Sequence, residues 1–399
     1  MSSAVSANFD IDVAVIGAGI HGAGMAQAAA AAGHSVLVLE QTAIAAGTSS
    51  RSSKLIHGGL RYLETGQLHL VRESLHERAT LLRLAPELVH LQRFYIPLYA
   101  HTRRRPWQLR TGLSLYALLA GLGREARFES LPPHGWNDLD GLTRSGLERV
   151  YCYHDAQTDD RALTRAVLHS AQSLGVRLLC PAQFIGATLC AVGLDLRFLI
   201  EGREQQCRAR VLINAAGPWA DTLASRIAPA IPVPSLQRVQ GAHIVLAGQL
   251  QRGIYYVESP RDGRAIFVMP WQGRVLVGTT ETRFRGDPGT VSASHTELHY
   301  LLGVLKAYFP AWRTAELTDI ADSFAGLRLL PGGPGHAFHR SRETLLVSDR
   351  AVKPRVLSIY GGKLTTYRAV AQRALARVAD SLPKRVALAR TDQLPLSAR

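Results

Sequence analysis

The stretch Ile11-Asp-Val-Ala-Val-Ile-Gly17-Ala-Gly19-Ile-His-Gly22 decides the fold of this chain of 399 residues. Its first six residues are a short run bounded by glycine, which predicts a buried β-strand. The G-x-G-x-x-G opens an alanine-rich segment, and this predicts a helix that continues to about Ala32 and ends at Gly33. A second strand is expected from Ser35 to Leu39, followed at once by Glu40. The stretch therefore predicts a β-α-β unit with an acidic residue at the end of its second strand.

Each of these residues has a physical task in a dinucleotide site. Gly17 permits the tight turn, Gly19 lets the backbone approach a pyrophosphate, and Gly22 lets helix and strand pack closely. The helix N-terminus supplies N–H groups and a partial positive charge for the phosphates. Glu40 can accept hydrogen bonds from a ribose diol. The motif predicts a dinucleotide but leaves NAD and FAD both open.

The next segment favours the larger cofactor. Residues 47–63 read Gly-Thr-Ser-Ser-Arg-Ser-Ser-Lys-Leu-Ile-His-Gly-Gly-Leu-Arg-Tyr-Leu, which is rich in hydroxyl groups and glycine. Such a loop so soon after Glu40 indicates a second contact surface for a cofactor. An amphipathic helix is expected at 68–84, before Pro86.

The remaining pattern predicts an α/β fold, with a Rossmann-type FAD-binding domain and a β-rich antiparallel-sheet substrate domain. Short strands with turns between 232 and 283 indicate the antiparallel sheet. The other helices are expected at 158–175, 294–308 and 365–381, and the other strands at 176–179, 194–200, 211–214 and 356–360. Both domains are discontinuous: we assign 1–85, 149–228 and 323–399 to the first, and 86–148 and 229–322 to the second.

Composition excludes several classes of protein. Hydrophobic residues make up 47% and charged residues 19%, so the chain can bury a sizeable core. It has no apolar run of eighteen residues and no signal peptide, so we expect a cytoplasmic protein without a membrane-spanning helix. The four cysteines lack C-x-x-C spacing, so we expect reduced thiols and no metal site.

The formal net charge of +15 has three explanations: codon bias toward arginine, an anionic substrate, or an anionic membrane or nucleic acid. Most arginines are scattered, and only Arg103-Arg104-Arg105 is dense, so nucleic-acid binding ranks low. Pro106, Trp107 and an apolar run from Leu113 to Leu122 follow this cluster. A basic edge with tryptophan beside an apolar helix can lie in a membrane interface. We favour the alternative that Leu113, Leu115, Tyr116, Leu118 and Leu119 belong to the core of the substrate domain.

Five segments give a resemblance to a known family. They are the glycine motif with Glu40, the run from Thr48 to Leu63, Asn214-Ala-Ala-Gly-Pro-Trp219 with Gly278-Thr-Thr280, and Gly361-Gly-Lys-Leu-Thr-Thr-Tyr-Arg368. They resemble the FAD-dependent glycerol-3-phosphate dehydrogenase and oxidase family, which has the D-amino-acid oxidase architecture. The resemblance runs from about residue 10 to about 385. Aerobic members carry a further helical domain beyond that point, which these 399 residues are expected to lack.

The resemblance implies oxidation of sn-glycerol 3-phosphate to dihydroxyacetone phosphate, with hydride transfer to flavin N5. It implies that Arg61 and Arg328 bind the substrate, with Tyr62 beside the first. Lys363 is expected to stabilise the forming carbonyl or the phosphate, and the helix after it to point at the flavin pyrimidine ring. His243 matches a histidine near the substrate and is the expected base, while a hydrogen-bonded strand histidine is the alternative. Residues expected to contact FAD are Gly17, Gly19, Gly22, Glu40, Thr48, Ser49, Ser53, Lys54, His57, Gly59, Gly217, Gly361, Gly362, Leu364 and Thr365.

Two other functions stay open at this point. The first is a flavin oxidase or dehydrogenase of an amine or 2-hydroxy acid, in which Arg61 and Arg328 would bind a carboxylate. The second is a basic flavoprotein that binds RNA or a protein partner, which the net charge motivates. The expected partners are a small phosphorylated alcohol and a quinone or other electron acceptor, with no nucleic acid. Contact with the inner face of the cell membrane and a homodimer are left open.

Overall fold

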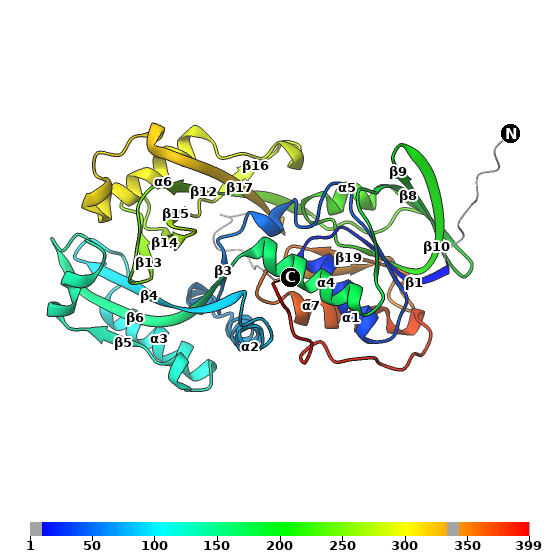
Figure 1. Ribbon diagram of the computed structural model, residues 1–399, viewed down its shortest axis with the longest axis horizontal. Coiled ribbons are helices and arrows are strands. Elements are labelled where there is room, and N and C mark those ends of the chain that lie inside the picture. The colour runs from blue at the N-terminus through cyan, green and yellow to red at the C-terminus, as the bar shows by residue number, and fades with distance from the viewer. Residues whose placement is uncertain (1–9, 333–342, 399) are drawn as a thin grey trace.

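The β-α-β unit at the N-terminus builds the first of two lobes in the computed structural model, which describes residues 10–332 and 343–398 (Figure 1). Its central strands are parallel, as strands joined by crossover helices must be. Along the sheet the order is β11 (Ile227–Ala228), β8 (Gln183–Cys190), β9 (Gly193–Ile200), β10 (Arg203–Asn214), β1 (Asp10–Ile16), β2 (Val36–Leu39) and β7 (Arg177–Leu179). The end of β10 also pairs with β19 (Val356–Tyr360), which pairs with β18 (Leu345–Ser348).

Helix α1 (Ile20–Ala31) is the buried centre of this lobe. It packs against α4 (Asp160–Ser173) and α7 (Tyr367–Val378), and most of its residues are buried. Alanine and glycine allow this packing, because a Cβ on Gly24 would lie 2.6 Å from the Tyr367 ring. Helix α2 (Leu68–Leu84) lies between the lobes in Figure 1, and the short α5 (Ala220–Ala224) follows β10.

The second lobe is a mostly antiparallel sheet. Its order is β16 (Thr282–Phe284), β12 (Leu236–Leu246), β15 (Arg274–Gly278), β14 (Ala265–Trp271), β13 (Ile254–Glu258), β4 (Val89–Tyr99), β6 (Leu147–Thr158) and β3 (Leu55–Ile56). In addition, β17 (Ile320–Pro331) pairs with β12, and β5 (Glu129–Leu131) pairs with β6. Helix α6 (His295–Tyr308) packs on this sheet and begins with a capping box between Ser294 and Glu297.

The α/β fold class and the antiparallel sheet are as the sequence predicts. Strand β6 continues to Thr158 in the second sheet, past the division expected at 148. Likewise β17 enters the second sheet at Ile320 and ends at Pro331, beside the first lobe. Long strands therefore carry the chain from one lobe to the other.

Helix α3 (Pro106–Leu119) shows that one expectation was wrong. Leu113 and Tyr116 are in the core, as expected, but Leu118 is 59% exposed. Trp107 and Leu122 are also exposed. Leu113 and Leu118 are five positions apart, half a turn out of phase, so only one of them can face the sheet.

The segment after α7 lies across the first lobe. The N–H groups of Leu388 and Ala389 donate to the carbonyl of Ala31, at 2.8 and 3.1 Å. Further on, the Leu396 N–H donates to Leu84 O at 2.7 Å, and the Leu396 side chain is buried. Among the residues that the structure describes, no helix is long and apolar enough to cross a membrane.

Candidate active site

A cavity of about 830 Å³ lies where the two lobes meet. This is near the upper end of the usual range for ligand cavities, about 300–1,000 Å³. The expected site residues that line it are Gly17, Gly19, Glu40, Thr48, Ser49, Ser53, His57, Gly59, Arg61, Tyr62, Gly217, His243, Arg328, Gly361, Gly362, Lys363, Leu364 and Thr365. Segments more than 300 residues apart in the sequence therefore meet at one cavity.

The glycine motif forms one wall of the cavity. Gly17 has a φ of +102°, and a Cβ there would lie 2.8 Å from Ala215 O, just after the neighbouring strand β10. A Cβ on Gly22 would lie 1.8 Å from Gly17 O, so Gly22 serves helix packing, as its place in the motif predicts. Gly19 precedes α1 and has no side-chain cap, so the start of the helix faces the cavity with backbone. This wall fits a pyrophosphate.

Glu40 is tied to the same loop. Its Oε2 accepts a hydrogen bond from Ala18 N at 2.8 Å, and its Oε1 accepts one from Thr42 N at 2.9 Å. The carboxylate therefore fixes the glycine turn and also lines the cavity, where a ribose hydroxyl can donate to it.

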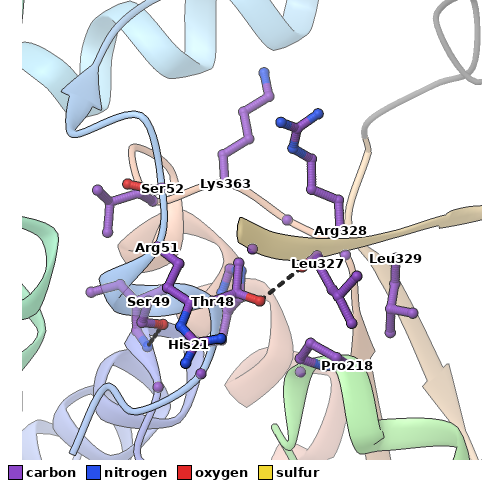
Figure 2. Close-up of a pocket in the computed structure, with 18 of the residues that line it drawn as sticks. His21, Thr48, Ser49, Arg51, Ser52, Pro218, Leu327, Arg328, Leu329 and Lys363 are labelled. Carbon is purple, nitrogen blue, oxygen red and sulfur yellow. Dashed lines mark hydrogen bonds between the residues drawn. The ribbon is translucent and has the colours of Figure 1, made fainter. Parts of the chain in front are cut away.

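The hydroxyl-rich loop joins the two lobes. Ser49 Oγ accepts a hydrogen bond from Ile20 N at 2.9 Å, and Thr48 Oγ1 donates to Leu327 O on β17 at 2.8 Å (Figure 2). Ser49 thus completes the first turn of α1. Thr48 fixes the position of the strand that carries Arg328.

Lys54 lies outside this wall. Its Nζ donates to Asp160 Oδ1 at 2.7 Å and to Ser50 O at 2.6 Å, and the side chain is buried. The Lys54 ammonium and the Asp160 carboxylate are both buried away from water, so each offsets the cost of burying the other's charge. The contacts give Lys54 a part in holding the loop, rather than a direct place on the cofactor.

The second glycine pair also lines the cavity, next to the first motif. Gly361 and Gly362 have φ values of +74° and +96°. A Cβ on Gly361 would lie 2.9 Å from Leu329 O, and one on Gly362 would lie 2.2 Å from His21 Nε2. Helix α7 begins two residues later than predicted, and Thr365 Oγ1 accepts a hydrogen bond from His57 N at 3.2 Å. The φ values and these close contacts require glycine at both positions, and the turn lines the cavity ahead of α7.

His21 stands between the two glycine pairs. Its Nδ1 is buried without a hydrogen-bond partner among the described residues. Burial, with a smaller contribution from Arg373, lowers the pKa of His21 to about 4. The residue lines the cavity at one of the three variable positions of the G-x-G-x-x-G, where the motif gives no signal for it.

Cationic side chains gather at the other end of the cavity. Arg61 Nη2 and Arg328 Nη1 lie 3.6 and 3.3 Å from the same carboxylate oxygen, Glu281 Oε1. The Lys363 ammonium lies over the Tyr62 ring, 3.8 Å from its centroid. Figure 2 shows the Lys363 and Arg328 side chains extending in the same direction from neighbouring segments. The cavity thus has a cationic end suited to an anionic substrate.

His243 lies in the strand next to this cluster. Its Nε2 is 2.9 Å from Ser53 Oγ, and its ring stacks on Phe324. Burial lowers the pKa of His243 well below its usual range, and the charges of Arg328 and Lys54 lower it further. The ring is therefore neutral at neutral pH, in reach of the cavity through Ser53.

Sequence reasoning missed Glu281 and Arg264, which both line the cavity. Arg264 Nη1 donates to the carbonyl of Glu281 at 3.1 Å. Glu281 follows directly after the motif Gly278-Thr-Thr280, which is the signal that could have found it. Nothing in the local pattern marks Arg264. The described residues show no cluster of three or more metal-ligating side chains.

The arrangement fits FAD. The glycine wall ahead of α1 offers backbone to a pyrophosphate, Glu40 can accept from a ribose, and the Gly361-Gly362 turn ahead of α7 can face the pyrimidine ring. Apolar residues such as Phe267, Leu327 and Leu329 line the space between them and can pack on a flat ring system.

Comparisons with known proteins agree with this geometry. A family model described as FAD dependent oxidoreductase matches residues 12–368. A D-erythritol 1-phosphate dehydrogenase of Brucella abortus is 34% identical, over 94% of this chain and 74% of its own length. A glycerol-3-phosphate dehydrogenase of Pseudomonas aeruginosa is 38% identical, over 92% of this chain and 71% of its own.

Solved structures give the same result. The FAD complex of the glycerol-3-phosphate dehydrogenase from Bacillus halodurans superimposes with a TM-score of 0.75 at 25% identity, covering 97% of this chain and 68% of that one. An FAD-bound L-α-glycerophosphate oxidase from Mycoplasma pneumoniae also gives 0.75, at 18% identity, covering 98% and 99% of the two chains. The chain therefore belongs to the FAD-dependent oxidoreductase family, in the group that includes the glycerol-3-phosphate dehydrogenases, and its cofactor is FAD.

Proposed function

We propose that the chain oxidises sn-glycerol 3-phosphate to dihydroxyacetone phosphate. The observation that carries this proposal is the convergence of Arg61, Arg328 and Lys363 at one end of a cavity whose other walls fit a flavin dinucleotide. A phosphate group held there leaves the rest of a small alcohol to reach toward the flavin. Remote binding energy of this kind positions the reacting carbon.

The residues divide the chemistry as follows. The arginines bind the phosphate through paired N–H groups, and Lys363 adds a positive charge close by. The neutral His243 accepts the hydroxyl proton at Nε2, where the Ser53 hydroxyl lies now. When bound, FAD would supply the acceptor for the hydride, which leaves the carbon that bears this hydroxyl group.

A longer polyol phosphate is the second candidate, because a relative that is 34% identical is named D-erythritol 1-phosphate dehydrogenase. Erythritol 1-phosphate carries the same phosphate and one more hydroxymethylene unit. The cationic end would hold both substrates alike, so the two candidates differ in the chain length that the cavity accepts.

Anaerobic flavin bleaching tests the proposal. The purified protein is mixed without oxygen with glycerol 3-phosphate, erythritol 1-phosphate, glycine and 2-hydroxyglutarate, and absorbance of the oxidised flavin is followed. Fast bleaching by glycerol 3-phosphate is the expected result. Bleaching by the amine or the hydroxy acid, with none by either phosphate, would replace the proposal by its alternative.

We propose further that α3 brings the protein to the surface of an anionic membrane, where a quinone can accept the electrons. Trp107, Leu118 and Leu122 are 68%, 59% and 60% exposed, and Arg103 and Arg105 flank them. Sedimentation with anionic vesicles should exceed sedimentation with zwitterionic ones. Trp107→Ser combined with Leu118→Ser should abolish the difference, and equal sedimentation of the unaltered protein with both vesicles would refute the contact.

A further inference from the structure

Glu281 is a negative charge in the wall of a cavity end that is otherwise built to attract anions. It lies between β15 and β16, its side chain is 6% exposed, and it lines the cavity. Its Oε1 is within 3.6 Å of Arg61 Nη2 and 3.3 Å of Arg328 Nη1. A carboxylate beside a substrate anion costs affinity by repulsion, so its presence there requires an explanation.

The two arginines come from separate parts of the molecule. Arg61 belongs to the short helical segment Leu60–Thr65, and Arg328 belongs to β17. Two guanidinium groups directed at one point repel each other, and each side chain is long and flexible. A carboxylate oxygen that both contact offsets this repulsion and limits the positions of the two groups.

The backbone of Glu281 is held in turn. Arg264 Nη1 donates to its carbonyl at 3.1 Å, and Arg264 Nε lies 3.3 Å from Asp262 Oδ2. Arg328 Nη2 also donates to Thr279 Oγ1 at 3.0 Å, two residues before Glu281. The backbone of Glu281 is therefore held in place, so its carboxylate can determine where the two guanidinium groups lie.

The described groups around Glu281 can be added up. Arg61, Arg328 and Lys363 carry three positive charges and Glu281 carries one negative charge, which leaves two positive charges. Arg264, which also lines the cavity, is paired with Asp262. A phosphate monoester is close to a dianion at neutral pH, since its second pKa is about 6. A carboxylate has a single charge and matches this sum less well.

We propose that Glu281 is a positioning residue that aligns Arg61 and Arg328 for a phosphate dianion and sets the local charge to match it. The inference rests on the proposed function and deepens it, because it assigns the phosphate preference of the same site to one side chain. Glu281 acts through the two arginines and takes no part in proton or hydride transfer.

The test uses the FAD-bound protein with inorganic phosphate as the probe. Phosphate binding is measured from the change it causes in flavin absorbance, and the saturating rate of flavin reduction is measured with glycerol 3-phosphate. Glu281→Gln keeps the shape and removes the charge. We expect it to bind phosphate about 3- to 10-fold more tightly, because one repulsion is lost, and to reduce flavin at least tenfold more slowly, because the arginines are no longer aligned.

Glu281→Asp separates charge from alignment. It keeps the charge but shortens the side chain by one methylene, so phosphate affinity should stay within about twofold of the unaltered protein while reduction slows. Glu258→Gln is the matched control, because Glu258 also pairs with an arginine, Arg104, and does not line the cavity. It should leave both measurements unchanged. Flavin content and the melting temperature of each variant confirm that it is folded.

A merely structural role would weaken phosphate binding and lower flavin content together in Glu281→Gln. That result, or an unchanged saturating rate, would overturn the inference. Failure of the proposed function is a separate outcome, in which no phosphorylated alcohol reduces the unaltered protein. The comparison of phosphate affinities remains a test of Glu281 in that case, since it requires no turnover.

Discussion

The two ends of the cavity are built in different ways. The nucleotide end is local: Gly17, Gly22 and Glu40 lie within one β-α-β unit, backbone geometry requires the two glycines, and the Glu40 carboxylate accepts from Ala18 N in the same turn. The cationic end is assembled from distant segments that bring Arg61, Glu281 and Arg328 within 3.6 Å contacts. Defects at the nucleotide end should therefore remove fold and cofactor together, while defects at the cationic end should spare both.

The largest effect is expected at the nucleotide end. In Gly22→Ala the new methyl group would lie 1.8 Å from Gly17 O, which is backbone and cannot turn aside. We expect a loss of more than about 3 kcal/mol of stability and a protein without flavin. Chemical unfolding and the ratio of flavin to protein measure this.

Gly303→Ala is the matched control, because Gly303 lies in α6 with no atom within 4 Å of an added Cβ. It should stabilise the protein by about 0.5–1 kcal/mol. Gly22→Ala protein that keeps its flavin would show that helix and strand can separate, and the contrast between the two ends would fail.

At the cationic end, Arg328→Ala should lower kcat/KM for glycerol 3-phosphate by roughly 100-fold or more, about 3 kcal/mol, because a charge-assisted pair of hydrogen bonds is lost. Flavin content should not change. Steady-state kinetics with an artificial acceptor provide the measurement. Arg274→Ala, an exposed arginine of β15, should behave like the unaltered protein. A flavin-free Arg328→Ala variant would mean that the two ends are not separable.

His21 tests the nucleotide end by pH. Its pKa is about 4 in the folded protein and about 6.5 in the unfolded chain, so the unfolded chain binds a proton first as pH falls. Stability should decrease between pH 6.5 and 4 by about 2 kcal/mol from this residue, allowing for partial exposure, and change no further below that window. His21→Asn should remove that part of the pH dependence of urea unfolding.

The control for this series is His169→Asn, since His169 is exposed on α4. Its pH dependence should match that of the unaltered protein. Should His21→Asn show the same loss of stability between pH 6.5 and 4 as the unaltered protein, His21 would have no share in it.

The smallest effect is expected for Glu40→Gln. The carboxylate accepts from both Ala18 N and Thr42 N, and an amide would place its own N–H₂ against one of these donors. FAD affinity should fall about tenfold, close to 1.4 kcal/mol. Titration of the apoprotein with FAD measures this, beside Glu204→Gln, an exposed residue of β10. If the two variants bound FAD equally well, the Glu40 carboxylate would have no role in FAD binding.

The difference between local and long-range structure also explains how much of the fold could be predicted from the sequence. The β-α-β unit, helix α2 and strand β19 were predicted to within a residue or two, because period and glycine placement are local signals. The long strands β4 and β6 were not, because the 91–150 region lacks a clear period. Leu118 was assigned to the core from its apolarity alone, although the phase of α3 turns it outward.

For the site, motifs placed most residues at the cavity, and contacts decided the rest. Lys54 lies within the most distinctive motif, yet its partner Asp160 is more than 100 residues away and cannot be read from the motif. The roles of Arg264 and Glu281 likewise depend on partners that are distant in the sequence: Arg264 binds the Glu281 carbonyl, and Glu281 pairs with Arg328. Pairing across a sheet depends on register, which a single sequence specifies only weakly.

Strand β17 has a consequence for how ligands communicate. It pairs with β12 along the second lobe, receives the Thr48 hydrogen bond at Leu327, and contacts the Gly361 turn at Leu329, with Arg328 between the two. A flavin bound against these walls would therefore affect the positions of Leu327 and Leu329, the residues on both sides of Arg328. By thermodynamic reciprocity, a substrate that gains affinity from bound FAD must tighten FAD by the same factor, so release of flavin should slow whenever phosphate is present.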